Sequence, residues 1–148
     1  MLTDLSGKNF MRTKEEKMNS LHIDIARELI ACAQNKTTIY YSDLCDKVGY
    51  PSPRTIGREL EKISLLTEEK YGFFISALVV GKETPDGGGH LPGNGFFTMY
   101  RQVRRDSDIP ITDMGWREAV ALLERKKAYI ADLSMLPEYI RNEIAAVE

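Results

Sequence analysis

Hydrophobic residues in the first part of the chain recur every three or four positions, as on one side of an amphipathic helix. This spacing predicts a helix over about residues 14–34, a short helix over 43–48 that Gly49 ends, and a third helix that begins at Pro53. A brief β-branched stretch at 36–40 suits a short strand between the first two. The residues expected to be buried are Met18, Leu21, Ile25, Leu29 and Cys32 in the first helix and Ile56, Leu60 and Ile63 in the third.

Polar residues stand where these helices are expected to begin. Thr13 and Glu16 have the capping-box spacing, in which each side chain satisfies a backbone N–H of the other residue. Ser42 is placed to cap the second helix. Ser52 followed by Pro53 is typical of a helix start, because the first turn does not need the N–H that proline lacks. A helix, a short turn and a second helix are therefore expected over residues 42–63.

The pattern changes period after the third helix. Residues 73–80 form an apolar run of strand length, rich in aromatic and branched side chains, and 96–100 form a second one. Between them, residues 81–95 contain six glycines and two prolines, which favour an extended loop. Three helices followed by a β-hairpin predict an α+β fold, a winged helix-turn-helix with a two-stranded, glycine-rich wing. The expected organisation is a flexible tail over 1–13, the winged-helix domain over 14–103 and a helical C-terminal extension over 104–148.

The C-terminal extension has two helical stretches. Asp113 is placed to cap a long helix, and Pro137 opens a last one. We interpret these helices as packing on the winged domain or as pairing with a second copy of the chain in a homodimer. The expected buried stripes are Trp116, Val120, Leu123, Lys127 and Ile130 in the long helix and Ile140, Ile144 and Val147 in the last.

Composition and charge narrow the classes of protein. The 148 residues are 43% hydrophobic and 28% charged, the balance of a soluble globular domain. No apolar run approaches the roughly 18 residues that a membrane span needs, and the first residues lack the apolar core of a secretory signal, so we expect a cytoplasmic protein. The net charge of −2 argues mildly against an autonomous nucleic-acid binder, although it leaves room for a local basic face.

The stretch YSDLCDKVGYPSPRTIGREL, residues 41–60, resembles the DNA-binding half of alkylguanine-DNA alkyltransferases and their alkyltransferase-like relatives. In that family a tyrosine opens a short helix that ends in glycine, and an arginine followed three residues later by glycine opens the recognition helix. The resemblance extends over about residues 37–95 and implies a winged-helix DNA-binding domain. The residues that match the family's pattern are Tyr41, Gly49, Arg54 and Gly57.

The sequence departs from that family at its reactive centre. The family's Pro-Cys-His-Arg, or the Pro-Trp-His-Arg of its non-reactive relatives, is replaced by Ser76, Ala77 and Leu78. A thiolate nucleophile also needs a nearby base or cation, which this segment does not supply. We therefore expect no alkyl transfer and, since no other catalytic constellation stands out, no enzyme.

Cations gather on the second and third helices and at the root of the glycine loop. They suit contacts with phosphates, but the same residues also suit a solvated face that forms salt bridges with neighbouring carboxylates. Tyr41 either stacks on a base, as the resemblance implies, or packs its ring on the core. The residues that we predict to contact nucleic acid are Tyr41, Ser52, Arg54, Thr55, Arg58, Lys62, Lys82 and His90.

No cofactor or metal is expected. The glycine loop is followed by an expected strand instead of the helix that a phosphate-binding loop requires. Two cysteines and two histidines, widely spaced, do not form a zinc motif. The sequence thus favours a non-catalytic DNA-binding protein, with the third helix and the wing as contact elements. The alternative is a protein-interaction module, an adaptor or inhibitor of bacterial or phage origin that uses the same scaffold.

Overall fold

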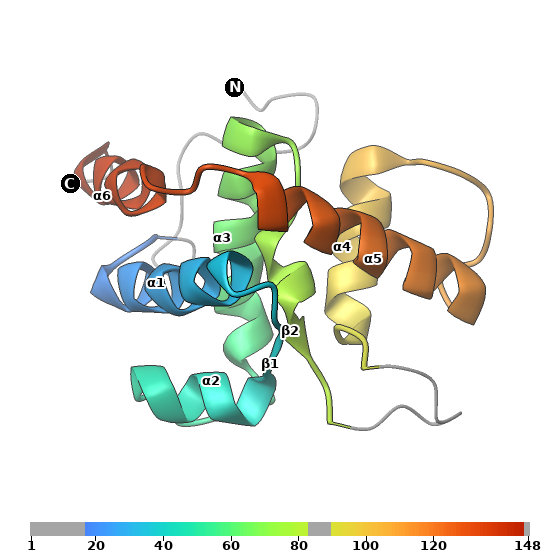
Figure 1. Cartoon of the computed structure of the whole chain (residues 1–148), viewed down its shortest axis with the longest axis horizontal. Coiled ribbons are helices and arrows are strands. Elements are labelled where there is room, and N and C mark those ends of the chain that lie inside the picture. Colours follow the sequence, from blue (N-terminus) through green and yellow to red (C-terminus); the bar gives the residue numbers. More distant parts are fainter. Residues whose placement is uncertain (1–16, 83–89, 147–148) are drawn as a thin grey trace.

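The computed structural model describes residues 17–82 and 90–146, and in these residues the chain is mainly helical (Figure 1). Within this described part, six α-helices, one 3₁₀ helix and two very short strands follow one another. Their bounds are α1 Ser20–Gln34, β1 Ile39–Tyr40, α2 Tyr41–Val48, α3 Ile56–Tyr71, the 3₁₀ helix η2 Ile75–Leu78, β2 Val79–Val80, α4 Asn94–Arg104, α5 Met114–Ile130 and α6 Leu136–Ala146.

The strands correct the predicted fold. β1 and β2 pair in parallel, with Ile39 opposite Val79 and Tyr40 opposite Val80. Residues 96–100, which were predicted to be the second strand of a wing, lie inside the helix α4. A parallel pair joined through two helices replaces the antiparallel hairpin, so the prediction of a winged helix with a two-stranded wing is wrong. The tip of the predicted wing, residues 83–89, lies outside the described residues.

Side chains of two helices explain why residues 73–78 do not form a strand. The hydroxyl of Thr67 donates to the carbonyl of Phe73 at 2.7 Å and accepts from the N–H of Ile75 at 3.1 Å. The carboxylate of Glu124 accepts from the N–H of Phe74 at 2.8 Å, and the hydroxyl of Ser64 accepts from the N–H of Ser76 at 2.8 Å. Backbone groups that a neighbouring strand would satisfy are thus bonded to side chains of α3 and α5. The segment is completely buried as an irregular turn and η2.

Residues 96–100 form a helix because their aromatic side chains gather on one side of it. Phe96, Phe97, Met99 and Tyr100 are buried, while Thr98 between them is exposed, as a helical face requires. They belong to a second hydrophobic cluster, between α4, α5 and the start of η2. This cluster consists of Phe74, Ala77, Phe96, Phe97, Met99, Tyr100, Trp116 and Val120.

The first three helices agree with the pattern of apolar residues, but their starts differ. α1 begins after Asn19, which caps it in a capping box with His22, and the predicted Thr13–Glu16 box lies outside the described residues. α2 begins at Tyr41 without a side-chain cap and ends at Gly49, whose φ of 75° is the left-handed conformation that glycine adopts readily. Ile56, Leu60 and Ile63 are buried as predicted, together with Ile25, Leu29 and Leu44 in the main core.

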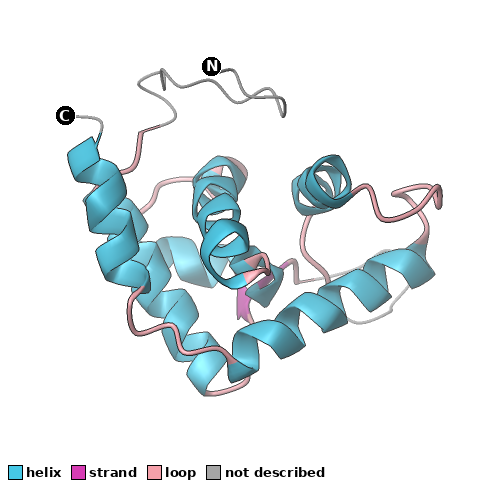
Figure 2. Cartoon of the chain, turned by 90° about the horizontal axis from the view of Figure 1, so that it is seen from above, coloured by secondary structure: helices cyan, strands magenta, loops and turns pink. Residues whose placement is uncertain are grey.

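The C-terminal helices pack on the rest of the chain. The carboxylate of Asp113 caps α5, as predicted, by accepting from the N–H of Trp116 at 2.8 Å. α6 lies beside α1, and its Ile140 is fully buried in the main core. The predicted stripe of α5 is partly wrong, because Leu123 and Ile130 are exposed. In the view from above, α5 runs along the outer edge of the molecule (Figure 2). None of the helices in the described part is both long enough and apolar enough to span a bilayer.

Candidate nucleic-acid interface

α2 and α3 are joined by a turn, residues 49–55, which is held by its own hydrogen bonds. The carbonyl of Ser52 accepts from the N–H of Thr55 and from that of Ile56, both at 3.2 Å. The hydroxyl of Tyr50 lies 3.1 Å from Oγ1 of Thr55. The turn is therefore fixed before any ligand is present, which reduces the entropic cost of binding there.

Two arginines stand exposed where this turn enters α3. Arg54 lies in the turn and Arg58 lies four residues further on, in the first turn of α3. Neither forms an ion pair with any residue that the structure describes. Gly57 between them is exposed, and a Cβ added there would meet no atom within 4 Å. Two unpaired guanidinium groups therefore flank a stretch of bare backbone.

Ser52 and Thr55, which were predicted as contacts, lie in the same turn and support it. The hydroxyl of Ser52 accepts from the N–H of Arg54 at 3.2 Å, so it fixes the backbone of that residue. The predicted N-cap at Ser52 is wrong, because α3 begins after Thr55 and has no side-chain cap. The N-terminal end of α3 thus joins the two arginines on an exposed edge. It has no side-chain cap, and the carbonyls of Ser52 and Thr55 accept from the N–H groups of Ile56 and Arg58.

Lys62, in contrast, is turned toward the N-terminal end of α1. Its ammonium group donates to Oε1 of Glu59 at 3.1 Å and to the carbonyl of Lys17 at 3.5 Å. The same oxygen of Glu59 lies 2.8 Å from Nε2 of His22. Burial alone would raise the pKa of Glu59, but the hydrogen bonds from Lys62 and His22 outweigh it and hold that pKa below its ordinary value. Lys62 therefore joins α3 to α1 and is not a free cation.

Tyr41 is also engaged within the protein. Its hydroxyl oxygen accepts from the N–H of Gly93 at 2.8 Å, and its ring is half-buried against the main core. Burial raises the pKa of the phenol, and the hydrogen bond from Gly93 opposes that shift only in part. Of the two roles considered for Tyr41, the geometry agrees with ring packing and leaves its hydroxyl occupied.

Lys82 and His90 lie together around Tyr40, at the end of the small sheet. The rings of Tyr40 and His90 meet edge to face with centroids 5.3 Å apart, and Nζ of Lys82 lies 5.6 Å from the centroid of the Tyr40 ring. The carbonyl of His90 accepts from Nη2 of Arg125 at 3.1 Å. Sequence reasoning missed both Tyr40 and Arg125. Tyr40 ends β1 directly before Tyr41, which begins α2, whereas no local signal connects Arg125 with this loop.

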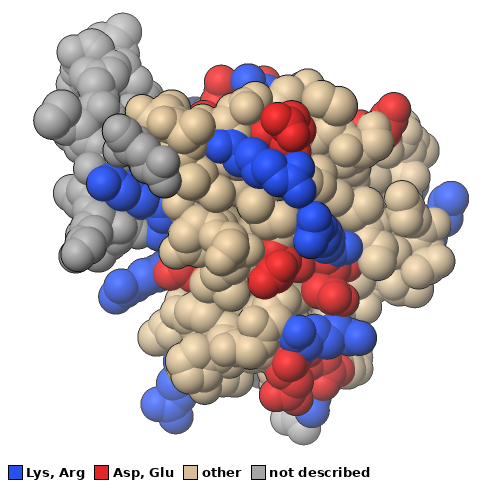
Figure 3. Space-filling view, turned by 90° about the vertical axis from the view of Figure 1, so that its left-hand side faces the viewer, with Lys and Arg blue, Asp and Glu red and all other residues tan. Residues whose placement is uncertain are grey.

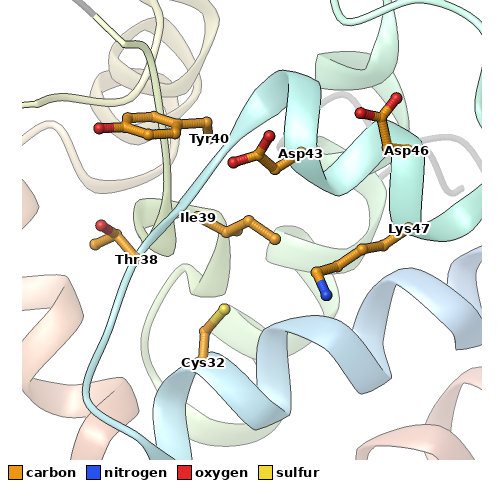
Figure 4. Close-up of a pocket in the computed structure, with 7 residues that line it drawn as sticks. All are labelled: Cys32, Thr38, Ile39, Tyr40, Asp43, Asp46 and Lys47. Atoms are coloured by element: carbon orange, nitrogen blue, oxygen red, sulfur yellow. The ribbon is translucent and has the colours of Figure 1, made fainter.

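A cavity of about 560 Å³ opens beside α2 (Figure 4). It is bounded by the C-terminal end of α1, by β1 and by α2. Burial raises the pKa of the Cys32 thiol, so that thiol is protonated near neutral pH and is not an activated nucleophile. The remaining polar groups are the hydroxyls of Thr38 and Tyr40 and, on α2, two carboxylates and one ammonium group. The lining residues are Cys32, Thr38, Ile39, Tyr40, Asp43, Asp46 and Lys47.

Ser76, which stands in the segment that replaces the resembling family's reactive motif, is buried and structural. Its hydroxyl accepts from the hydroxyl of Ser64 at 2.6 Å, and its N–H donates to that same oxygen. Neither bond brings a base to the Ser76 oxygen, so this serine lacks the partner that an activated nucleophile needs. Among the described residues, no group of three or more His, Cys, Asp or Glu side chains is placed to hold a metal ion.

The surface seen from the left side of Figure 1 has Lys and Arg side chains close to Asp and Glu side chains, with no uniform basic area (Figure 3).

Comparison of the chain with known protein families, with curated proteins and with solved structures found no match. The features that bear on function are therefore the turn between α2 and α3 and the residues at the start of α3.

Proposed function

We propose that the chain is a non-catalytic DNA-binding protein that presents the start of α3 to the duplex. The observation that carries the proposal is the pair of exposed arginines at the start of α3, Arg54 and Arg58, which form no ion pair with any described residue. In helix-turn-helix proteins the N-terminal residues of the second helix contact the base edges while the first helix crosses the backbone. We infer the same docking for this chain, with the start of α3 facing the groove of the duplex.

The electrostatics of this edge support the proposal despite the net charge of −2. Glu59, the carboxylate nearest to Arg58 along α3, is neutralised by Lys62 and hydrogen-bonded to His22. Its charge is thus compensated inside the fold. The guanidinium groups of Arg54 and Arg58, which form no ion pair with any described residue, remain available to phosphates.

The predicted residues have different roles under this proposal. Arg54 enters the groove and Arg58 contacts a phosphate, while Ser52 and Thr55 position the backbone of the turn. Lys82 and His90 contribute a second, peripheral phosphate contact near Tyr40. Tyr41 and Lys62 contribute indirectly: they stabilise the fold and do not themselves contact the DNA.

Fluorescence anisotropy with labelled duplexes of mixed sequence tests the proposal. The double variant Arg54→Ala, Arg58→Ala is expected to weaken binding by at least tenfold, or about 1.4 kcal/mol, and to reduce the salt slope by about two. The matched control is Lys70→Ala with Arg141→Ala, which removes the same charge from the far end of α3 and from α6. This control is expected to retain most of the affinity. Equal binding by the parent and the Arg54 and Arg58 variant would overturn the proposal and favour a protein partner.

A second comparison separates groove contact from simple attraction. Arg54→Lys keeps the charge but loses the planar, five-donor guanidinium that recognises a base edge. We expect this variant to lose discrimination among duplex sequences, whereas Arg58→Lys keeps it. If both variants discriminate equally among duplex sequences, Arg54 contacts phosphates and not base edges.

A further inference from the structure

The outward side of α5 is apolar at positions where a surface helix is ordinarily polar. Leu122 is 52% exposed, Leu123 47% and Ile130 85%. The helix that carries them, α5, runs along the outer edge of the molecule (Figure 2). The residues that α5 buries against the protein are Trp116, Val120, Ala121, Glu124 and Ala128. Leu122 therefore lies opposite the buried side of α5, and Leu123 and Ile130 lie between the two sides. Together these three exposed residues form a second apolar stripe, and such a stripe marks an interaction surface.

The charges along this stripe are complementary to themselves. Glu118 and Lys126 are exposed and form no ion pair with any described residue. Each lies four residues from Leu122, Glu118 on the N-terminal side and Lys126 on the C-terminal side, about 6 Å from it along the axis. In two antiparallel copies of α5 that cross at Leu122, Glu118 of each copy lies opposite Lys126 of the other.

The sizes of the side chains fit the same arrangement. Gly115 is exposed near the N-terminal end of the stripe, and Ile130 projects from the C-terminal end. Antiparallel pairing centred on Leu122 places Gly115 close to the bulky, exposed Ile130 of the other copy. A small residue opposite a large one allows the helices to approach closely. Charge and size therefore select the same register.

We propose that the outer face of α5 binds a second copy of this chain, antiparallel, in a symmetric dimer whose two-fold axis passes beside Leu122. Residues 115–130 span about 23 Å of helix, so the interface is at the small end of the specific class and a dissociation constant on the order of micromolar is expected. α5 crosses the front of the molecule in Figure 1 and α2 lies at its lower edge. The two-fold axis therefore places the edge that contains α2 on the same side of the dimer in both copies.

Sedimentation velocity over a range of protein concentrations tests the dimer. The parent is expected to change from monomer to dimer as concentration rises, and Glu118→Lys to weaken the dimer by about fivefold or more, because each charge counts twice in a two-fold dimer. Combining Glu118→Lys with Lys126→Glu is expected to restore association to within about twofold of the parent. Val103→Glu, at an exposed apolar position of α4, is the matched control and is expected to leave association unchanged.

Engineered cysteines test the register. Leu122→Cys places two thiols beside the two-fold axis, where mild oxidation is expected to join the two chains. Ile130→Cys, although more exposed, places its thiols about 24 Å apart along the axis and is expected to remain unlinked. The unmodified chain, with Cys32 and Cys45 only, is the control.

Monomeric behaviour of the folded parent at every concentration would overturn the proposed dimer, and efficient linkage through Ile130→Cys would overturn the antiparallel register. Neither outcome depends on DNA binding, which the variants of Arg54 and Arg58 test separately.

Discussion

The buried carboxylate of Glu124 accepts a hydrogen bond from the backbone N–H of Phe74, fifty residues earlier in the chain, at 2.8 Å. Its other oxygen lies 3.4 Å from Nζ of Lys127 and 3.6 Å from Nη1 of Arg104. Next to it in α5, Nε of Arg125 donates to the carbonyl of Ala77 at 2.8 Å. α5 therefore fixes the backbone of residues 74–77 through two consecutive side chains, and this fixed segment leads into β2.

Replacing Glu124 is expected to lower the free energy of unfolding by an amount that depends on which of its contacts the new side chain can still make. Glu124→Leu leaves the N–H of Phe74 without a partner and Arg104 without one of its two carboxylates, which is expected to cost about 3–5 kcal/mol. Glu124→Gln keeps an acceptor for Phe74 and is expected to cost roughly 1–2 kcal/mol. Urea denaturation gives both values. Equal, small losses for the two variants would show that the hydrogen bond to Phe74 contributes little.

Helices with local signals could be predicted from the sequence. The apolar spacing around Ile56, Leu60 and Ile63 located α3, and the short polar side chain of Asp113 located the start of α5. Residues 73–80 could not be assigned, because a continuous apolar run has the same appearance in a strand and in a buried turn. The deciding partners, Thr67 and Glu124, belong to helices that meet this run only in the folded protein.

The aromatic residues of α4 were predicted to form a strand, although they form a helix. Phe96, Phe97 and Tyr100 have strand propensity, but propensity is weak where a tertiary cluster decides the conformation. Their contact with Trp116, with ring centroids of Phe97 and Trp116 5.7 Å apart, requires a helix. That contact joins segments that no local pattern connects.

The candidate site was predictable only in part for the same reason. The exposed position of Arg54 and Arg58 at the start of α3 could be predicted, because the spacing that locates this helix is a local property. The roles of Lys62 and Tyr41 depend on Lys17 and Gly93, which are 45 and 52 residues away in the chain. A sequence pattern gives no information on partners at that separation.

Acid is expected to weaken the contact between α1 and α3 through His22. Nδ1 of this fully buried ring accepts from the N–H of Asn19 at 2.9 Å, so the hydrogen of the neutral ring is on Nε2 and is donated to Glu59. Burial lowers the pKa of His22 below 6.5, although Glu59 opposes that shift. The unfolded chain therefore takes up a proton first as pH falls. Stability is expected to decline from pH 6.5 down through the lowered pKa of the folded state.

His22→Gln separates this titration from the structural role of the ring. Glutamine at this position can complete the capping box with Asn19 and donate to Glu59, but it has no charge to gain. Urea denaturation at about pH 7.5 and about pH 5.5 is expected to show a smaller loss of stability for His22→Gln than for the parent. His90→Gln, at an exposed histidine, is the control and is expected to keep the parent's dependence on pH. A parent whose stability is constant over this interval would contradict the assignment.

Tyr41→Phe is expected to lower stability without changing DNA affinity. The substitution keeps the ring and removes the acceptor for the N–H of Gly93, which is expected to cost about 1 kcal/mol. Tyr40→Phe is the matched control. The hydroxyl of Tyr40 lies on the exposed surface, 3.4 Å from Nε2 of His90, and such a long hydrogen bond is expected to contribute little to stability. Denaturation and anisotropy titrations are made on both variants. A large loss of DNA affinity in Tyr41→Phe, with stability unchanged, would return Tyr41 to the interface.

Gly57→Ala is expected to stabilise the protein and weaken its binding to DNA. The second residue of α3 is exposed and a Cβ there meets no atom within 4 Å, so alanine is expected to add about 0.5–1 kcal/mol through helix propensity. The same methyl group would stand between Arg54 and Arg58, where close approach of the backbone to DNA leaves no room for it. Affinity is therefore expected to fall by about three- to tenfold. Gly95→Ala is the matched control: it is the second residue of α4, equally open, and is expected to gain similar stability with unchanged affinity. If both variants bind DNA as the parent does, the backbone at Gly57 does not approach the duplex closely, and only the arginine side chains make the contact.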